Sequence, residues 1–404
     1  DIMAQECVQS DLPALAFVED IAPLPPSVIS VVVYGLAGEI CTLDAPAEAT
    51  VGELKDAIEI NTRIPRSRQR LSSQRGVHLK DECQLTEYGL SPATPIVYLV
   101  QIELYKRLFA IGGYASMVDL VDGQDVLSSA EMLDLTTLSW KPLPSMTIRR
   151  ARFGAAALDG RIYVVGGYGD RPYHHGRCAL KSGEVLDLDG ADAGEWTPLP
   201  PMNSARAGLC VAVLAGKLYA LGGGDGTEKW ASVEVFDPHL GTWSQLPPMG
   251  SARTRFAAVA LDDRIYVFGG MTEYYGASPT AEVFEPEASM WTPLPPMSTA
   301  RLSPGAAALR SKIYIIGGYN GREVLDTVEV FDPGTCEWTS APSMNTRRTS
   351  LSAAGQENRL FVVGGTVDKV SFNSVEVFDP REGSWSLLPA PMSTCRASLQ
   401  VGLV

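Results

Sequence analysis

The sequence predicts a multidomain protein, in which an all-β, six-bladed propeller closed by its C-terminal strand follows a small α+β domain. Two observations predict this fold. One frame with a period of about 47 residues recurs six times after residue 106, and each copy holds four short β-patterned runs. Ahead of the repeats, two β-patterned runs and a helical pattern indicate a ββα unit. We therefore divide the chain into a tail (1–27), an α+β domain (28–101) and a propeller (102–404).

The length, net charge and cysteine content of the chain argue against several classes of protein. Its 404 residues carry a net charge of −14, which argues against nucleic-acid binding and against a polybasic membrane contact. No apolar run approaches the roughly 18 residues of a membrane-spanning helix. The seven cysteines are odd in number and form no C-x-x-C pair, so we expect reduced thiols in an intracellular, cytoplasmic protein. Because the chain starts at Asp1, organelle targeting stays open.

Residues 1–27 have the composition of a tail. They contain five acidic residues and no Lys or Arg, and the run APLPPSV near their end disfavours helix and sheet alike. Four apolar residues could hold this tail in place: Leu12, Leu15, Phe17 and Val18. Docking on the protein's own body and docking on a partner are both open.

Residues 28–101 carry the pattern of a small α+β domain. The β-branched run 29–34, a turn and the alternating run 40–43 predict a hairpin. Thr50 with Glu53 three residues later forms a capping box, which predicts the start of a helix. The run 96–100 predicts a final strand.

This stretch resembles the ubiquitin-like β-grasp family. The segment VGELKDAIEINTRIPRSRQRL is similar to the family's helix and the strand after it, and LKDECQLTEYGL to the stretch before its last strand. Two departures limit the resemblance. Ser72 and Ser73 follow Leu71 where the family's receptor-binding patch has an Ile, and the domain continues into Gln101 instead of ending in a free Arg-Gly-Gly tail. A structural or partner-docking domain and a domain that contacts the ubiquitin machinery are the two alternatives.

Four features mark each repeat of residues 102–404. They are a Gly-Gly pair (112/113, 166/167, 222/223, 269/270, 317/318, 364/365), a Glu (Glu131, Glu184, Glu234, Glu282, Glu329, Glu376), a Trp (Trp140, Trp196, Trp243, Trp291, Trp338, Trp385) and an Arg (Arg150, Arg206, Arg253, Arg301, Arg348, Arg396). A four-stranded unit of this size cannot bury both faces alone, so the copies must stack radially. The first copy lacks its leading strand, and the Arg-led run 396–404 has no Gly-Gly strand after it. We expect that run to complete blade 1 and close the ring.

The repeated Arg and Glu are expected on one face of the disc. In an antiparallel blade, the start of the first strand, the end of the second and the start of the third lie on the same side. Charge pairing between Arg and Glu is the structural interpretation of this pattern. Contact between some of these residues and a ligand is the alternative.

The repeat resembles the kelch family through its Gly-Gly pair, the acidic start of the next strand and the spaced Trp, and all six copies match. In kelch proteins that act as substrate receptors of ubiquitin ligases, the same face holds acidic peptides through arginines at the blade starts and tyrosines after Gly-Gly. By position, the resemblance implies such a role for the six repeated arginines and for Tyr114, Tyr168 and Tyr319. Those receptors carry a separate adaptor domain for the ligase, and we identify none in this sequence.

Function on a repeated scaffold is expected where the repeats differ. Blades 1 and 2 have longer loops on the Arg face, and other blades place aromatic or extra basic residues there. Aromatic residues and Arg dominate protein interfaces, so we expect protein partners on this loop face. The candidate residues are Arg149, Arg150, Arg152, Arg255, Arg347, Tyr114, Tyr168, Tyr173, Trp230, Tyr274, Tyr275 and Tyr319. Solvated polar loops without a partner are the alternative.

An enzymatic function finds little support. His174 and His175 share one loop, whereas His78 and His239 fall elsewhere, so the histidines cannot converge on one metal. No nucleophile elbow, P-loop or zinc-protease motif occurs. We therefore expect no catalytic residue, metal or cofactor, and interpret the chain as a non-catalytic interaction scaffold, such as an accessory subunit of a larger assembly. The alternatives are a substrate adaptor for ubiquitin-dependent turnover and a small-molecule or sugar-active propeller enzyme.

Overall fold

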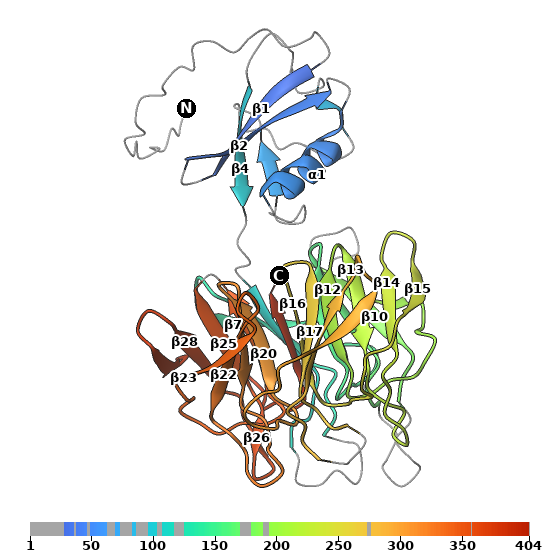
Figure 1. Ribbon diagram of the computed structural model, residues 1–404, viewed down its shortest axis with the longest axis vertical. Helices are drawn as coiled ribbons and strands as arrows, with labels where there is room; N and C mark the ends of the chain where they lie inside the picture. Colours follow the sequence, from blue (N-terminus) through green and yellow to red (C-terminus); the bar gives the residue numbers. More distant parts are fainter. Residues whose placement is uncertain are drawn as a thin grey trace, which may run out of the picture. The chain divides into compact units, whose positions relative to one another are not determined.

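The computed structural model divides into two compact units, Asp1–Glu103 and Leu104–Val404, and each is described by itself (Figure 1). The residues that the structure describes are 28–35, 38–46, 49–62, 69–72, 83–85, 96–102, 107–116, 125–169, 179–188, 194–272, 276–356 and 358–403. The tail, residues 1–27, lies outside them. In the described part of the chain, no helix is long and apolar enough to cross a membrane.

The first unit is a four-stranded sheet with one helix. The sheet has the order β2-β1-β4-β3, in which β1 and β4 are parallel and the other neighbours are antiparallel. Its elements are β1 (Val28–Gly35), β2 (Gly38–Pro46), α1 (Val51–Thr62), β3 (Gln69–Ser72) and β4 (Ile96–Ile102). This mixed sheet with the ββα start confirms the predicted α+β fold.

The helix α1 begins where the capping box predicts it. The amide of Glu53 donates to Oγ1 of Thr50 (3.2 Å), and the amide of Thr50 donates to Oε2 of Glu53 (2.7 Å). Two of the unpaired amides at the helix start are thereby satisfied. The apolar face of the helix then packs on the sheet, where Leu54 and Leu71 share one buried cluster.

The second unit contains six four-stranded sheets, which are the blades of the propeller (Figure 1). Blade 1 consists of β30 (Gln400–Leu403), β5 (Arg107–Ile111), β6 (Ala130–Asp134) and β7 (Ser139–Leu143). Blade 2 consists of β8 (Gly154–Leu158), β9 (Arg161–Val165), β10 (Gly183–Asp187) and β11 (Trp196–Leu199). Blade 3 consists of β12 (Cys210–Leu214), β13 (Lys217–Leu221), β14 (Val233–Asp237) and β15 (Thr242–Leu246).

The remaining blades repeat this order. Blade 4 consists of β16 (Ala257–Leu261), β17 (Arg264–Phe268), β18 (Ala281–Glu285) and β19 (Met290–Leu294). Blade 5 consists of β20 (Gly305–Leu309), β21 (Lys312–Ile316), β22 (Val328–Asp332) and β23 (Glu337–Ala341). Blade 6 consists of β24 (Ser352–Gln356), β25 (Arg359–Val363), β28 (Val375–Asp379) and β29 (Ser384–Leu387), and its loop forms a small hairpin of β26 (Thr366–Val367) and β27 (Val370–Ser371).

The C-terminal strand closes the ring, as the sequence predicts. β30 pairs antiparallel with β5, so that Val401 lies opposite Ala110 and Leu403 opposite Leu108. The first strand of each blade contacts the first strand of the next, in the cycle β8, β12, β16, β20, β24, β30 and back to β8. These inner strands are rich in Ala, Gly and Ser because they converge on the axis.

Each repeat tryptophan joins its blade to the preceding one. The indole N–H of Trp338 donates to the carbonyl of Pro295 (2.9 Å), and that of Trp140 donates to the carbonyl of Ala390 across the closure (3.0 Å). The other four make the same bond to Pro144, Pro200, Pro247 or Pro342. The repeated Trp therefore fills space between blades and also satisfies a backbone carbonyl there.

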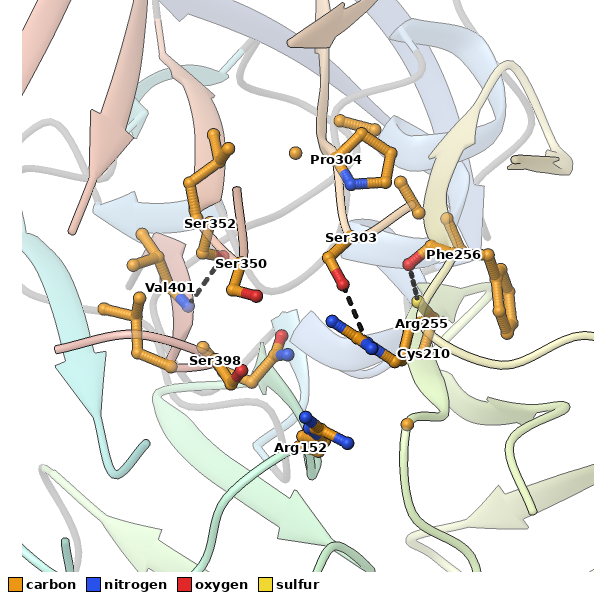
Figure 2. Close-up of a pocket in the computed structure, with 18 of the residues that line it drawn as sticks. Arg152, Cys210, Arg255, Phe256, Ser303, Pro304, Ser350, Ser352, Ser398 and Val401 are labelled. Carbon is orange, nitrogen blue, oxygen red and sulfur yellow. Dashed lines mark hydrogen bonds between the residues drawn. The ribbon is translucent and has the colours of Figure 1, made fainter. Parts of the chain in front are cut away.

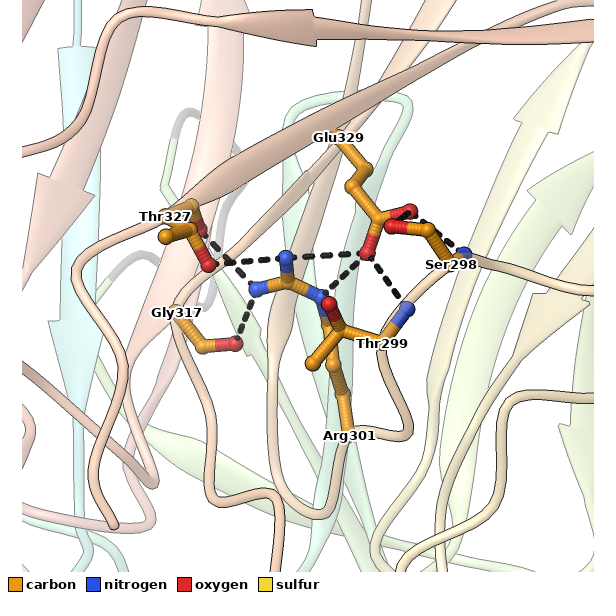
Figure 3. A network of polar contacts seen from close by, with 6 residues as sticks. All are labelled: Ser298, Thr299, Arg301, Gly317, Thr327 and Glu329. Atoms are coloured by element: carbon orange, nitrogen blue, oxygen red, sulfur yellow. Dashed lines mark hydrogen bonds and ion pairs between the residues drawn. The ribbon is translucent and has the colours of Figure 1, made fainter.

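The repeated Arg and Glu form a buried ion pair in every blade. In blade 5, Nη2 of Arg301 lies 3.0 Å from Oε1 of Glu329, and Nη1 donates to the carbonyls of Gly317 (2.8 Å) and Thr327 (2.9 Å), as Figure 3 shows. Gly317 has a φ of 61°, and a Cβ there would lie 2.5 Å from the carbonyl of Arg348. Arg, Glu and Gly-Gly thus form one structural unit, which confirms the structural interpretation of the pair.

Candidate functional site

Six residues encircle the propeller axis where the inner strands begin. Each follows a repeated Arg by two positions, and each has a left-handed φ between 50° and 66°: Arg152, Gly208, Arg255, Ser303, Ser350 and Ser398. The amide of each donates to the carbonyl of its neighbour in the preceding blade, at 2.7 to 3.4 Å, so the six bonds form a closed circle. We call these residues the axial ring.

The backbone of the axial ring decides where its side chains lie. A left-handed conformation disfavours residues other than Gly by about 1 kcal/mol, and here it recurs in every blade because the circle of hydrogen bonds requires it. A cavity of about 150 Å³ opens among these residues and the first residues of the inner strands. We call this cavity the channel mouth.

The two sides of the channel mouth differ in chemistry. Blades 2 and 4 contribute the guanidinium groups of Arg152 and Arg255, which we call the arginine pair. Blades 5, 6 and 1 contribute neutral polar groups: Ser303, Ser350, Ser352, Ser398 and Gln400. Figure 2 shows the hydroxyl groups of Ser350 and Ser398 across the opening from Arg255. The described residues that line this cavity include no Asp or Glu.

The arginine pair is electrostatically unlike the repeated arginines. Nε of Arg255 donates to Oγ of Ser303 (3.0 Å), whereas Nε of Arg152 is buried without a hydrogen-bond partner. Burial, followed by repulsion from Arg152, lowers the pKa of Arg255 to about 10, so Arg255 is still charged at neutral pH. Among the described residues, neither arginine has a carboxylate partner. Within the part of the chain that the structure describes, these two cations therefore have no counter-charge.

A second cavity of about 180 Å³ adjoins the arginine pair and is lined in part by a loop of blade 3. Its lining includes Tyr168, Gly208, Glu228 and Lys229 together with Arg152 and Arg255. The arginine pair thus faces both the axis and a recess between the loops. Both cavities lie on the face that the sequence predicts for a partner.

Among the predicted site residues, the structure brings Arg152, Arg255 and Tyr168 together. It corrects the prediction for Arg150 and Tyr114, whose exposed fractions are 0% and 1%. Arg150 directs its N–H groups to Glu184, Gly166 and Ser182, so it is unavailable to a partner. The same holds for the other five repeated arginines, which are equally buried.

The remaining candidates lie apart from the channel mouth. Arg149 and Arg347 are exposed, and Arg347 lies 3.6 Å from Glu323. Tyr319 is half-buried, and its backbone pairs with Leu302. Whether these three residues contact a partner stays a prediction. Tyr173, Tyr274 and Tyr275 lie outside the described residues, as do His174 and His175.

Trp230 occupies a repeated position, although the sequence frame does not include it. Its ring packs on the guanidinium of Arg206, with Cζ 5.3 Å from the ring centre, as Phe372 packs on Arg348 at 4.8 Å. Its backbone is hydrogen-bonded to Gly223 and Arg253, and in blade 5 the backbone of Leu325 is hydrogen-bonded to the equivalent residues, Gly318 and Arg348. Trp230 therefore covers a buried arginine, which gives it a structural role.

The sequence-based selection missed the serines of the channel mouth. Their signal is the residue two positions after each repeated Arg, which is Ser in blades 5, 6 and 1, Arg in blades 2 and 4, and Gly in blade 3. Comparison at that offset would have found Ser303, Ser350 and Ser398. No group of three or more His, Cys, Asp or Glu within the described ranges could hold a metal ion.

Comparisons with known proteins agree with this architecture. A family model for the KLHDC2/KLHL20/DRC7 Kelch-repeats domain matches residues 98–301 and 251–398, and a ubiquitin family model matches residues 29–102. Human Kelch-like protein 28 is 38% identical over 123 residues, which are 30% of this chain and 20% of that protein. Kelch domain-containing protein 8B of Rattus norvegicus is 33% identical over 121 residues, which are 28% of this chain and 33% of that protein. The chain thus spans only 20% to 33% of these two relatives.

A solved structure shares the fold. The structure of YjhT matches with a TM-score of 0.56 and 14% identity, over 65% of this chain and 91% of that one. At this identity, the likeness concerns the fold alone.

Proposed function

The chain belongs to the kelch-repeat family, and from that premise we propose that its propeller is a non-catalytic protein-interaction module that holds an acidic segment of a partner protein at the channel mouth. The observation that carries the proposal is the arginine pair. Arg152 and Arg255 are largely withdrawn from water and have no carboxylate partner among the described residues. The repeated arginines beside them are each paired with a Glu.

The electrostatics of the pair favour an acidic ligand. A guanidinium that leaves water loses hydration energy, which a fixed anion nearby restores. Among the described residues, Oγ of Ser303 accepts from Nε of Arg255, and Nε of Arg152 has no acceptor. A carboxylate between them would accept charge-assisted hydrogen bonds from both side chains. Acidic segments should therefore bind more tightly than neutral ones.

The size of the cavities favours a polypeptide segment over a small-molecule substrate. Volumes of about 150 and 180 Å³ lie below the roughly 300 to 1,000 Å³ of ordinary ligand pockets. We therefore expect each cavity to hold side chains of the partner. The rest of the partner would lie on the surrounding loops, where Arg347 is exposed. This division between anchor and rim is typical of protein interfaces.

Selection from a peptide display library on the immobilised full chain tests the proposal. We expect the selected peptides to be rich in Asp and Glu and to lose affinity for Arg152→Ala and Arg255→Ala. Arg149→Ala is the matched control, because Arg149 is exposed on the same face but does not line either cavity. Peptides without acidic residues, or peptides retained by both channel-mouth variants, would contradict the proposal.

The ubiquitin family match at residues 29–102 favours a second candidate function. A ubiquitin-like domain joined to an interaction propeller would suit an adaptor that brings a bound partner to the ubiquitin machinery. Affinity purification from cell extract, with the full chain and with a chain lacking residues 28–103, tests this function. Loss of ubiquitin receptors or ligase subunits from the shortened chain would support an adaptor. Recovery of the same proteins by both chains would leave the scaffold interpretation.

A further inference from the structure

The channel mouth carries more positive charge than one carboxylate can neutralise. Two guanidinium groups line it, and its described lining residues include no Asp or Glu, so the formal charge of those residues is +2. The adjoining cavity adds Lys229 and Glu228, whose charges cancel. An Asp or Glu side chain supplies a single negative charge. Binding it would leave one buried guanidinium without a counter-charge.

The hydrogen-bonding groups around the pair also exceed the needs of a carboxylate. Oγ of Ser303 accepts from Nε of Arg255, so the Ser303 hydroxyl hydrogen points elsewhere and can serve a ligand. Ser352 is in the same position, because its Oγ accepts from the amide of Val401 (3.2 Å). Ser350 and Ser398 line the same cavity. Together with the guanidinium groups of Arg152 and Arg255, these hydroxyl groups surround one small space with hydrogen-bond donors.

We propose that the arginine pair and the serines of the channel mouth select a phosphoryl group, carried on a Ser or Thr of the partner segment, over a carboxylate. This inference rests on the proposed function and names the chemistry of its ligand. A phosphorylated side chain carries roughly −1.5 to −2 charges at pH 7 and three acceptor oxygens. Its charge matches the two guanidinium groups, and its oxygens match the hydroxyl donors on the opposite side. Phosphorylation of the partner would then switch binding on.

Isothermal titration calorimetry of the full chain with two pentapeptides tests this inference. Both have the sequence Ala-Ala-X-Ala-Ala with blocked ends, and X is phosphoserine in one and Glu in the other. At pH 7.5 we expect the phosphoserine peptide to bind roughly ten- to hundredfold more tightly, the factor of an additional charge-assisted hydrogen bond. Equal or tighter binding of the Glu peptide would overturn the inference.

The pH dependence of peptide affinity gives an independent test of the preference for a phosphoryl group. The second pKa of a phosphoserine is about 6, so its affinity should rise about tenfold from pH 5 to pH 7.5 as the dianion forms. The Glu peptide, with a pKa near 4.3, should change much less over this range. Arg255 stays protonated throughout because its pKa is about 10. A phosphoserine affinity that does not change with pH would count against dianion selection.

Single-residue variants show which side chains cause the preference for phosphoserine over Glu. Arg152→Ala or Arg255→Ala should reduce the phosphoserine-to-Glu ratio to about one, Arg152→Lys should keep part of it, and Arg149→Ala should keep all of it. Circular dichroism verifies that each variant is folded. If acidic peptides bind at the channel mouth without a phosphoserine preference, the inference fails and the proposed function stands. If neither peptide class depends on the arginine pair, both fail.

Discussion

Arg152 and Arg255 are joined through a single residue of the axial ring. The amide of Gly208 donates to the carbonyl of Arg152 (2.7 Å), and the carbonyl of Gly208 accepts from the amide of Arg255 (2.8 Å). A Cβ at residue 208 would lie 2.1 Å from Oγ1 of Thr254, so only Gly fits there. The backbone therefore fixes two like charges on either side of a residue that has no side chain.

We predict that Arg152→Gly raises stability while it removes binding. The substitution relieves a left-handed φ of 54° and removes a buried charge, so the free energy of unfolding should rise by about 1 kcal/mol. Ser398→Gly is the matched control for stability, since it relieves the same strain (φ 52°) without removing a charge. Urea unfolding and peptide titration measure the two effects. A loss of stability in Arg152→Gly would show that the arginine supports the ring.

The buried pair of blade 5 should show the opposite behaviour. We predict that Arg301→Met reduces the free energy of unfolding by about 3 to 5 kcal/mol, because Glu329 would remain buried without its counter-charge. Lys312→Met is the control in the same blade. Lys312 lies 3.1 Å from Asp332 but is about half exposed, so its loss should change stability by less than about 1 kcal/mol.

A double variant separates charge from packing at this site. Arg301→Met with Glu329→Gln removes both charges and keeps an acceptor for the amide of Ser298 (2.7 Å). It should therefore recover part of the stability that the single variant loses. Equal stability of the single and double variants would show that the lost hydrogen bonds to Gly317 and Thr327 dominate, and not the unpaired carboxylate.

Repetition explains why most of the fold could be predicted from the sequence. Six copies of one frame predict the ring, and the missing strand in the first copy predicts the role of β30. The Arg and Glu of the frame predict the buried pairs for the same reason. Each feature of the frame is observed six times, so an ambiguous residue in one copy does not change the prediction.

The site was harder to predict because it depends on backbone geometry near the axis. Arg149, Arg150 and Arg152 are near neighbours in sequence, yet the first is exposed, the second is buried in an ion pair, and the third lines the channel mouth. The left-handed conformation of residue 152 separates them. It arises from hydrogen bonds between blades, which no pattern within one repeat reveals.

Two cysteines should differ strongly in reactivity. Burial raises the pKa of Cys210 to about 12, and its thiol donates to the carbonyl of Phe256 (3.0 Å), whereas Cys336 is exposed. We predict that iodoacetamide at pH 8 modifies Cys336 and spares Cys210, because only the thiolate reacts. Mass spectrometry of the folded and the urea-unfolded protein measures this. Modification of Cys210 in the folded protein would contradict its raised pKa.

The raised pKa of Cys210 also predicts how the free energy of unfolding changes at alkaline pH. The folded pKa of Cys210 lies above the ordinary value of 9.0, so the unfolded chain loses this proton first as pH rises. The stability associated with this thiol is therefore complete below about pH 9 and decreases as pH rises from about 9 towards 12. Cys210→Ala should remove this contribution, which urea unfolding at pH 8 and pH 10 can measure. An unchanged pH dependence in the variant would assign the loss to other groups.

Variants of Trp230, the one tryptophan outside the sequence frame, distinguish a structural role of this residue from a role in an interface. Leu325 occupies the equivalent position in blade 5, so we predict that Trp230→Leu changes the free energy of unfolding by less than about 1 kcal/mol. Trp230→Ala should reduce it by about 2 kcal/mol or more, because it uncovers Arg206 and removes the cation–π contact. Phe372→Leu is the matched control at Arg348.

Peptide binding by the Trp230→Leu variant then settles the role. If Trp230 only covers Arg206, the variant should bind acidic peptides as the natural chain does, because Trp230 lines neither the channel mouth nor the cavity beside it. If Trp230 is an interface anchor, replacement by Leu should weaken binding at least tenfold with little loss of stability. Since the geometry places its ring on Arg206, we expect unchanged binding. A tenfold loss would extend the binding surface from the axis to the loop of blade 3.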